Sequence, residues 1–427
     1  MKRVAVITTF ADVFEAFSLC EVVRMQIKSL LGAGYYTTLV ACDGFRPEGM
    51  FAHPLLRHGL LPRYHLERDE QVVERPEEFR ANVDAIKARL APILDEVDVA
   101  ITHDIVYLTH HLAYNQACRE LGAERPQLRW LHWIHSAPAL HCSLPDDDAR
   151  SARFKPFPGS LLVYPNAYDV ARLGRQYAVG QECIRVVPHP LDYEETFDFH
   201  AVTRALMRAY DLYSPAILGV YPLRLDRGKQ PEKAVRLFAE LKAAGQSVRL
   251  IVASFHSTGD RFVGFREELR DEALRLGLAD DEVVFTSRLD TLPGIDDEAM
   301  ARYRVELPRK VVMDLFHLTN VYVHPSASET YSLVCQEAAA CGNVLFLNDD
   351  FPPMRDLHGA DALYVKFCST LFRTSYQPSE MAYYRDVARE IVHVLQTERA
   401  VRQKTRLRRT RNLGTVFRDH FEPLLYA

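Results

Sequence analysis

Residues 326–342 read SASETYSLVCQEAAACG, and they join a predicted strand to a predicted helix. The six residues before them, 320–325, form a short apolar run that stops at a proline, which is typical of a buried strand. Leu333 to Cys341 is rich in alanine and is followed by Gly342, which predicts a helix that ends there. This part of the chain therefore indicates an α/β fold in which the loop after a strand leads directly into a helix.

Two glutamates lie on either side of this junction. Glu329 falls in the loop, and Glu337 falls about a turn and a half inside the helix, since an α-helix has about 3.6 residues per turn. Between them, the N–H groups near Ser332 and Leu333 lie at a helix N-terminus, which attracts phosphate. A sugar nucleotide offers a diphosphate, a sugar and a ribose to these groups. Two solvated glutamates are the alternative, and the preceding Pro-Ser and the following glycine favour a binding site.

A basic turn earlier in the chain supports this interpretation. In order, the chain has an apolar β-type run at 216–221, the turn PLRLDRGKQP at 222–231 and a helical pattern at 232–243. Arg224 offers a planar fork of donors and Lys229 offers a point charge, and both suit a diphosphate at the end of a strand. A solvated basic turn is the alternative. Arg227 is a further cation to which the sequence assigns no role.

The two stretches resemble the E-x7-E motif and the Arg-Leu-x-x-x-Lys element of retaining GT-B glycosyltransferases, especially family 4. The resemblance implies GT-B architecture, with two Rossmann-like parallel-sheet domains that face a central cleft. It implies that Glu329 contacts the donor sugar, that Glu337 holds the ribose, and that the basic pair neutralises the leaving diphosphate. The residues implied to contact the sugar or the phosphate between the glutamates are Thr330, Tyr331, Ser332 and Leu333.

The first half of the chain carries further parts of the resemblance. Residues 98–104, DVAITHD, are similar to a family strand that ends in histidine near the acceptor cleft, which makes His103 and Asp104 acceptor-side candidates. Capping of a strand end is the alternative for both. Residues 186–192 are similar to the family's Val-Ile-Pro-Asn-x-Val-Asp strand. The chain departs from the family in two loops, since 8–14 has no Gly-Gly pair and 250–254 is not followed at once by Gly-x-Gly.

His135 is the candidate for contact with the reacting sugar. It follows a predicted strand at 128–134, and the ligands of open α/β sheets bind at the carboxyl ends of strands. The family places a histidine here that contacts the transferred sugar, so the resemblance implies a catalytic role for His135. A buried core histidine is the alternative, and His132, within the strand, fits that alternative better.

The length and composition predict a two-domain globular protein. The 427 residues exceed the usual size of one domain, and the hydrophobic content of 48% and charged content of 26% are ordinary. Predicted strands and helices alternate, which favours parallel sheets covered on both faces. We expect a first, acceptor-side domain over 1–200 and a donor domain over 214–405. The resemblance implies that a last helix, 406–427, crosses back to the first domain.

The apolar runs and helical spacings place the individual elements. Strands are expected at 4–8, 37–41, 97–102, 128–134, 161–164 and 184–187, and then at 217–221, 249–253, 283–286, 321–324 and 344–347. Helices are expected at 15–31 and 76–91, with Pro92 ending or kinking the second.

The net charge of −5 gives no overall basic field, so affinity for nucleic acid or an anionic membrane would need a local patch. The basic segment Arg399 to Arg411 is the candidate, with a solvated terminal helix as the favoured alternative. No run approaches the roughly 20 apolar residues of a membrane span, and the N-terminus reads as a buried strand rather than a signal peptide. Any contact with a membrane is expected to be peripheral.

The eight cysteines are scattered without zinc-site spacing, which indicates a reduced, cytoplasmic chain. Asp146 to Asp148 is interpreted as a loop or a helix cap rather than a metal site, so no metal and no cofactor are expected. The resemblance implies metal-independent transfer of a sugar, with retention, from a UDP-, GDP- or ADP-sugar to an acceptor hydroxyl.

Two other activities stay open, namely a nucleotide-sugar epimerase and a non-catalytic binding protein that retains the donor site. The acceptor is also open among a glycan, a lipid, a metabolite and a modified DNA base. A nucleic acid could stack on the aromatic residues Trp130, Trp133, Tyr383 and Tyr384, although these residues could equally pack in a core. The oligomeric state is not indicated.

Overall fold

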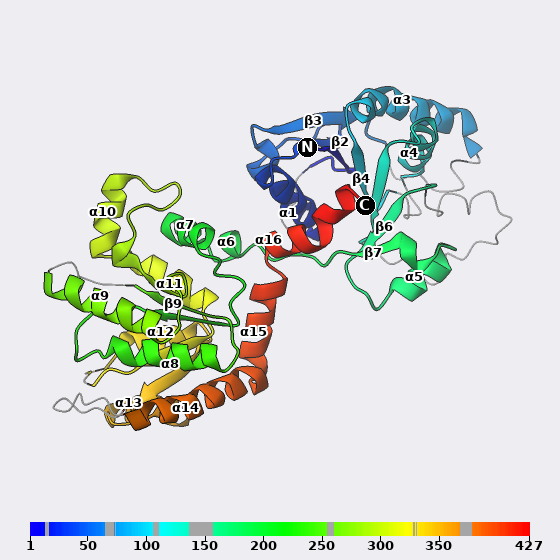
Figure 1. The fold of residues 1–427 in the computed structure, drawn as a ribbon. Coiled ribbons are helices and arrows are strands. Elements are labelled where there is room, and N and C mark those ends of the chain that lie inside the picture. Colours follow the sequence, from blue (N-terminus) through cyan, green and yellow to red (C-terminus); the bar gives the residue numbers. More distant parts are fainter. Residues whose placement is uncertain are drawn as a thin grey trace. The chain divides into compact units, whose positions relative to one another are not determined.

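The computed structural model describes the chain except for residues 13–16, 65–71, 73, 106–110, 136–156, 254–259, 328, 330 and 368–377. The chain divides into two compact units, Met1–Pro190 with Leu413–Ala427, and Leu191–Asn412 (Figure 1). Each unit is built on one parallel sheet. The expected α/β class with two Rossmann-like sheets is confirmed.

The seven-stranded sheet of the first unit has the order β3-β2-β1-β4-β5-β6-β7, and every neighbouring pair is parallel. The strands are β1 (Arg3–Ile7), β2 (Tyr36–Cys42), β3 (Leu56–Leu61), β4 (Val99–His103), β5 (Arg129–Trp133), β6 (Leu161–Tyr164) and β7 (Ile184–Val186). Strand order reverses between β1 and β4, and open α/β sheets bind ligands at such a point. His103 ends β4 on this edge of the sheet.

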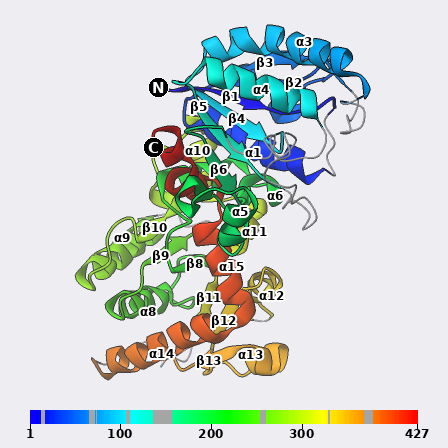
Figure 2. The same ribbon diagram turned by 90° about the vertical axis from the view of Figure 1, so that its right-hand side faces the viewer.

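Helices cover both faces of this sheet because the apolar side chains of the strands point to both sides. The helical elements are α1 (Ser18–Gly32), η1 (Gly49–Ala52), α3 (Pro76–Asp95), α4 (Leu112–Glu124), α5 (Val170–Gln176), η3 (Gln181–Cys183), α16 (Leu413–Val416), η6 (Phe417–Phe421) and η7 (Glu422–Leu425). Figure 2 shows α3 and α4 side by side over one face. Pro92 does not end α3, because the buried Leu94 holds the last turn against the core.

The six-stranded sheet of the second unit has the order β10-β9-β8-β11-β12-β13 and is also parallel. The strands are β8 (Ile217–Tyr221), β9 (Val248–Val252), β10 (Val283–Phe285), β11 (Val321–His324), β12 (Val344–Asn348) and β13 (Leu363–Val365). The central neighbours β8 and β11 end at the two loops that carry the basic turn and Glu329. The topology therefore brings these two loops to one edge of one sheet.

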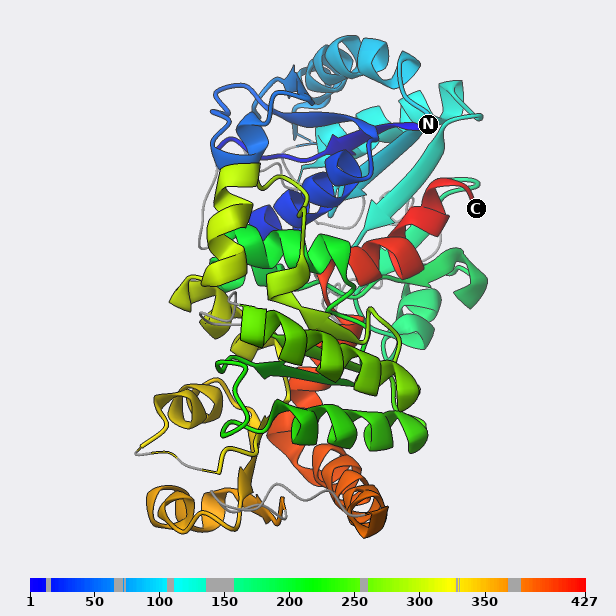
Figure 3. The same cartoon turned by 60° about the vertical axis from the view of Figure 1, so that its left-hand side comes forward.

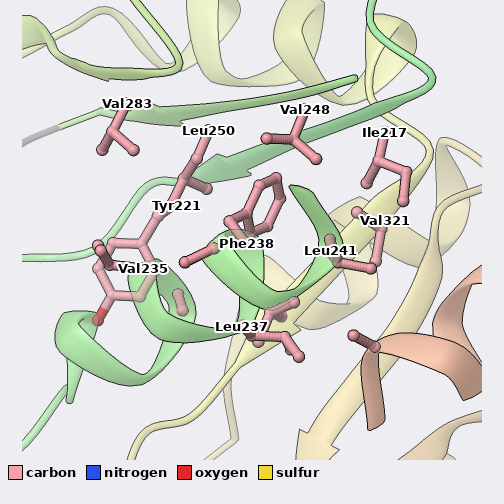
Figure 4. Close-up of a cluster of buried hydrophobic side chains, with 14 of the residues drawn as sticks. Ile217, Tyr221, Val235, Leu237, Phe238, Leu241, Val248, Leu250, Val283 and Val321 are labelled. Carbon is pink, nitrogen blue, oxygen red and sulfur yellow. The ribbon is translucent and has the colours of Figure 1, made fainter. Parts of the chain in front are cut away.

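The helical elements of the second unit are α6 (Tyr193–Thr196), α7 (Ala201–Ala209), α8 (Pro231–Ala243), α9 (Asp260–Arg275), η4 (Thr286–Arg288), α10 (Asp297–Val305), α11 (Arg309–Leu318), α12 (Leu333–Ala340), α13 (Pro353–His358), η5 (Gly359–Asp361), α14 (Pro378–Thr397) and α15 (Arg399–Thr410). Helices α8 and α9 lie next to each other (Figure 3). Phe238 of α8 packs among strand residues in the core (Figure 4). A Cβ atom on Gly219 of β8 would lie 2.5 Å from Cζ of Phe238, so this close approach requires glycine.

The boundaries of the units differ from the expected 1–200 and 214–405. The second unit begins at Leu191, because α7, which lies between the two expected domains, packs Val202 and Leu206 into the second core. It ends at Asn412, so the expected segment 406–427 is divided. Residues 406–412 belong to the second unit, and residues 413–427 belong to the first.

The basic segment 399–411 contains both exposed and buried cations. Lys404 donates to the carbonyl oxygens of Phe316 (3.0 Å) and Cys341 (2.7 Å). The fully buried Arg408 donates to the carbonyls of Leu212, Tyr213 and Pro215. The segment is therefore neither a simple solvated helix nor a continuous binding patch, since two of its cations hold the second unit together.

No helix within the described ranges has the length and apolar character needed to cross a membrane.

Candidate functional site

The loop between β8 and α8 is held in shape by its own polar groups. The Tyr221 hydroxyl donates to the carbonyl of Lys229 at 2.6 Å, and the backbone N–H of Lys229 donates to Asp226 at 3.1 Å. Nε of Arg224 lies 3.2 Å from the same Asp226 carboxylate, while more than half of the Arg224 side chain stays exposed. Asp226, which the sequence analysis did not single out, thus organises both basic residues. Their backbone is fixed and their cationic ends are presented at the edge of the sheet.

The loop between β11 and α12 lies against this basic loop. The N–H of Ala327 donates to the carbonyl of Gly228 at 3.0 Å. Asn348, fully buried at the end of β12, donates to the carbonyl of Ser326 at 3.1 Å. These two bonds tie the glutamate loop to the basic loop and to the neighbouring strand. As a result, Lys229 and Glu329, which are 100 positions apart, come together.

Glu329 contacts two cationic side chains. Its Oε1 pairs with Nζ of Lys229, and the same oxygen lies 3.4 Å from Nε2 of His324. Burial opposes ionisation of this carboxyl, but the contacts with His324 and Lys229 outweigh it and lower the pKa of Glu329 to about 2. Glu329 is therefore a carboxylate in this structure. His324 was not among the predicted site residues, although its place directly before Pro325 and Ser326 put it at the end of the predicted strand.

Helix α12 begins after Ser332, whose φ of 56° is in the left-handed region. The N–H of Cys335 already donates to the carbonyl of Ser332 at 3.2 Å, and the N–H groups before it have no helical carbonyl in front of them and so suit an anion. Tyr331 and Leu333 are about half exposed at this end, whereas Thr330 lies outside the described residues. These features keep the end of the helix open to a ligand.

Glu337 lies inside α12 and pairs with the guanidinium of Arg309 at the start of α11. The Glu337 side chain is only 14% exposed, and Arg309 is 72% exposed. A mostly buried carboxylate with a mobile surface partner can exchange that partner for ligand hydroxyl groups. Arg309 was not predicted, because only the fold brings α11 against α12.

The candidates of the first unit form a second cluster. Nδ1 of His103 lies 2.9 Å from Nε2 of His135, and Nε2 of His103 lies 3.0 Å from Oε1 of Gln26. His135 also stacks on His189, with ring centroids 5.7 Å apart. Asp104 accepts the backbone N–H of His135 at 2.8 Å, and it does so from a left-handed conformation with φ of 58°. The structure therefore brings all three predicted residues of this unit together.

Burial keeps these histidines neutral. Burial and the neighbouring His189 lower the pKa of His135 to about 3, and burial holds the pKa of His103 well below its usual range. A neutral imidazole can accept a hydrogen bond from a sugar hydroxyl group or donate one to it, without carrying charge. Gln26 and His189 were missed. The Pro-His-Pro run at 188–190 was the available signal for the second of them.

His132 lies apart from this cluster, fully buried on β5. Its Nδ1 is 2.8 Å from the hydroxyl of Thr102. Asp146 to Asp148 lies outside the described residues. Among the residues that are described, no group of three or more His, Cys, Asp or Glu side chains could hold a metal ion.

No family model matches the chain. The D-inositol 3-phosphate glycosyltransferase of Streptomyces scabiei (strain 87.22) is 25% identical to it over 255 residues, which are 57% of this chain and 51% of that protein. The predicted resemblance to GT-B, family 4-like glycosyltransferases is confirmed. The chain spans about half the length of this relative, so the similarity does not assign the relative's activity to this chain.

Solved structures of glycosyltransferases also match along nearly the whole chain. The UDP-forming α,α-trehalose-phosphate synthase of Burkholderia xenovorans matches with a TM-score of 0.39 and 16% identity, covering 100% of both chains. The sucrose-phosphate synthase of Thermosynechococcus elongatus matches with a TM-score of 0.34 and 18% identity, covering 99% of this chain and 96% of that chain. These TM-scores are low, and the description of the fold therefore rests on the two parallel sheets themselves.

Proposed function

We propose that the chain is a retaining glycosyltransferase that moves a sugar from a nucleoside diphosphate sugar to an acceptor hydroxyl without a metal ion. The observation that carries the proposal is the meeting of Lys229 and Glu329 at the carboxyl edge of the second sheet, beside the open N-terminus of α12. A diphosphate needs cations and N–H donors, and a sugar needs a carboxylate that accepts from its hydroxyl groups. The two loops supply both within one site.

Within this proposal, Arg224, Lys229 and the α12 N-terminus receive the diphosphate. Glu329 accepts from hydroxyl groups of the sugar, and Glu337 accepts from the ribose. Tyr331, Ser332 and Leu333 line the path between the two glutamates, and Thr330 belongs to the same path in the sequence. The base of the nucleotide is left among uracil, guanine and adenine.

The chemical step breaks the bond between the sugar's anomeric carbon and the phosphate oxygen. The electron pair leaves with that oxygen, and the cations and the helix end stabilise the negative charge where it develops. The acceptor oxygen forms the new bond on the same face of the sugar, and its proton passes to the departing phosphate oxygen. Because protein cations neutralise the diphosphate, the proposed step needs no metal.

His135 is proposed to contact the transferred sugar through a neutral ring, consistent with its low pKa of about 3. His103 and Asp104 are proposed to support the acceptor side. Among the possible acceptors, a small polar metabolite is the first to test, because the Streptomyces relative is named for inositol 3-phosphate. A glycan, a lipid and a modified DNA base follow. A cytoplasmic location belongs to the same proposal, supported by the free thiols of the described cysteines.

The test is a thermal-shift and turnover screen of the full chain against UDP-, GDP- and ADP-sugars. We expect one nucleotide series to raise the melting temperature, and Lys229→Ala and Glu337→Ala each to reduce that shift by at least half, because each removes a predicted ligand contact. Arg389→Ala is the matched control, since Arg389 is exposed on α14 and pairs with Asp386. The absence of any shift with all three series would overturn the proposal.

The same screen separates the other candidate activities. Conversion of the nucleotide sugar into an isomer without an acceptor would indicate an epimerase. Binding with neither hydrolysis nor transfer across the acceptor classes would indicate a non-catalytic donor-binding protein.

A further inference from the structure

His324 is a fully buried histidine beside the candidate donor site to which the proposed function gives no role. It is the last residue of β11, a strand whose four residues are all buried. Its Nδ1 lies 2.9 Å from the hydroxyl of Tyr322, two residues back on the same face of the strand, and its Nε2 lies 3.4 Å from Glu329. One ring nitrogen thus faces the core and the other faces the first glutamate of the motif.

The two cations that contact Glu329 differ in mobility. His324 is fixed by its strand and by Tyr322, which in turn packs its ring edge-on against Phe316 at 5.6 Å. Lys229 has a fixed backbone, but its charge is carried on a flexible four-carbon chain that is 22% exposed. Both cations contact the same carboxylate oxygen. The lysine can therefore leave while the histidine stays.

Donor binding requires this exchange. Lys229 and Glu329 neutralise each other in their ion pair, although the proposed function assigns them to different parts of the donor. An incoming diphosphate competes with Glu329 for the ammonium of Lys229. When the lysine moves to the diphosphate, Glu329 would be left as a mostly buried carboxylate, at 15% exposure, unless a second cation remained.

We propose that His324 is a positioning residue that holds the Glu329 carboxylate, charged and oriented toward the sugar, while Lys229 is transferred from Glu329 to the donor diphosphate. This proposal rests on the proposed function, in which Lys229 binds the diphosphate. It adds a residue outside the E-x7-E and Arg-Leu-x-x-x-Lys elements.

The groups that face His324 support a protonated ring. Burial alone would lower its pKa, but the contacts with Cys335 and Glu329 outweigh burial and raise the pKa of His324 to about 9. The titratable groups packed around it are Tyr322 on its own strand, Glu329 on the loop, Cys335 on α12 and His358 on α13. Near neutral pH the ring therefore carries the charge that the exchange needs.

A double-mutant cycle on nucleotide affinity tests the exchange. The probes are UDP, GDP and ADP without sugar, measured by calorimetry on the full chain. Glu329→Gln should tighten binding about threefold to tenfold, because it releases Lys229, and His324→Asn should weaken binding by a similar factor, because Glu329 then depends on Lys229 alone. In the Glu329→Gln background, His324→Asn should have no further effect. Equal effects of His324→Asn in both backgrounds would contradict the proposal.

A second measurement needs no nucleotide. NMR titration of the histidine side chains should show the pKa of His324 near its raised value in the wild-type chain and lower by more than one pH unit in Glu329→Gln. Glu390→Gln, an exposed change on α14, is the control and should leave it unaltered. An unchanged His324 titration in Glu329→Gln would overturn the inference even if His324→Asn failed to fold.

The two measurements distinguish failure of the inference from failure of the proposed function. If none of the three nucleotides binds the wild-type chain, both the proposed function and the transfer of Lys229 are wrong, whatever the titration shows. If a nucleotide binds but the cycle is additive, only the role of His324 is wrong. The conservative variant His324→Gln keeps a neutral donor near the position of Nε2, and partial recovery relative to His324→Asn is expected.

Discussion

The buried histidines of the first unit are neutral because burial disfavours the imidazolium form. His103 and His132 are almost completely excluded from solvent, and the pKa of each is depressed, that of His132 to about 3. The hydrogen-bond partners of His103 are Gln26 and His135 and that of His132 is Thr102, and none of them is an anion, while the nearby Arg119 lowers the pKa of His132 further. The environment of His324 is the opposite, because a carboxylate lies beside its ring and its pKa is raised.

We predict that the first unit loses stability as the pH falls from 7 to 5. The folded-state pKa values lie below the unfolded value of 6.5, so the unfolded chain takes up protons first and its free energy falls relative to the folded chain. The stability is fully present above pH 6.5 and is lost progressively below it. The fully buried His132, with its pKa of about 3, should cost about 2 kcal/mol at pH 5, and His103 should add a loss in the same direction.

Tryptophan fluorescence during urea unfolding measures this effect in the first unit alone. The two tryptophans of the chain, at 130 and 133, both lie on β5. His132→Gln should reduce the loss between pH 7 and pH 5, whereas His58→Gln, an exposed change on β3, should not. A loss of the same size in His132→Gln as in the wild-type chain would show that this histidine is not the cause.

At the scale of the elements, local pattern predicted strands that have a neighbouring strand on both sides. The structure gives 161–164, 217–221 and 321–324 the same bounds as the sequence predicted. Such strands are buried on both faces, so they are continuous apolar runs, and turn residues mark their ends. The helix expected from Leu333 to Cys341 was also found within one residue, since Gly342 adopts the positive φ that ends it.

Elements whose stability comes from tertiary contacts were missed. Strand β3 reads LRHGLL, in which three polar or glycine positions interrupt the apolar run, and it exists because it pairs with β2. Helix α7 lies between the two expected domains, and its apolar stripe packs against the core of the second unit. The edge strand β3 is too short and too polar to show an apolar period, whereas the apolar stripe of α7 was present in the sequence but was not used.

The same limit applies to the candidate site. The residue types of Lys229 and Glu329 indicated a ligand, and the fold brings them into contact. Arg309 and Gln26 touch the candidates through packing of separate elements, which a single sequence does not encode as a local pattern, whereas His324 was already visible at the end of the strand that leads into the glutamate loop. Each of them is a supporting contact rather than part of a motif.

Helix α15 shows how position decides the role of a cation. Arg408 is 1% exposed and donates to three carbonyls of the segment before β8. Arg406, on the same helix, is exposed, and its guanidinium donates to the side chain of Gln403 within the helix. Arg408→Met should destabilise the second unit by about 3 kcal/mol or more, because it leaves buried carbonyls without donors. Arg406→Met should change stability by less than about 0.5 kcal/mol.

The stability of the second unit in these two variants can be measured by urea unfolding, with hydrogen exchange of the backbone N–H groups of β8 and β9 as the readout. Equal effects of the two substitutions would mean that Arg408 contributes no more than a surface charge, and would return the whole basic segment to the candidates for a binding patch.

At the scale of the whole molecule, the chain passes between the two units twice, at 190–191 and at 412–413. The two ends of the second unit are joined to each other, because the N–H of Leu191 donates to the carbonyl of Arg411 at 2.6 Å and Leu191 pairs with Asn412. The second unit is thus one continuous segment that closes on itself.

The first unit, by contrast, is completed by the last residues of the chain. Phe417, Phe421 and Leu424 are buried in its core, and the ring of Phe421 meets Trp133 edge-on at 5.1 Å. The hydroxyl of Tyr35 donates to Glu422 at 2.7 Å. Figure 1 shows this segment, in red, beside α1. A fragment that ends at residue 190 therefore lacks part of its own core.

We predict that a fragment of residues 191–412 folds by itself and binds the nucleotide found for the full chain, because it contains its own core, its own joined ends and both loops of the candidate donor site. Its far-ultraviolet circular dichroism should show a single cooperative thermal transition, and Lys229→Ala should weaken its nucleotide binding as in the full chain. A fragment of residues 1–190 should be far less stable than the same fragment with 413–427 appended through a flexible linker, since the aromatic residues of that segment bury about 2 to 3 kcal/mol each. If 191–412 folds cooperatively yet binds no nucleotide that the full chain binds, the donor site requires residues of the first unit, and the assignment of donor binding to the second unit alone is wrong.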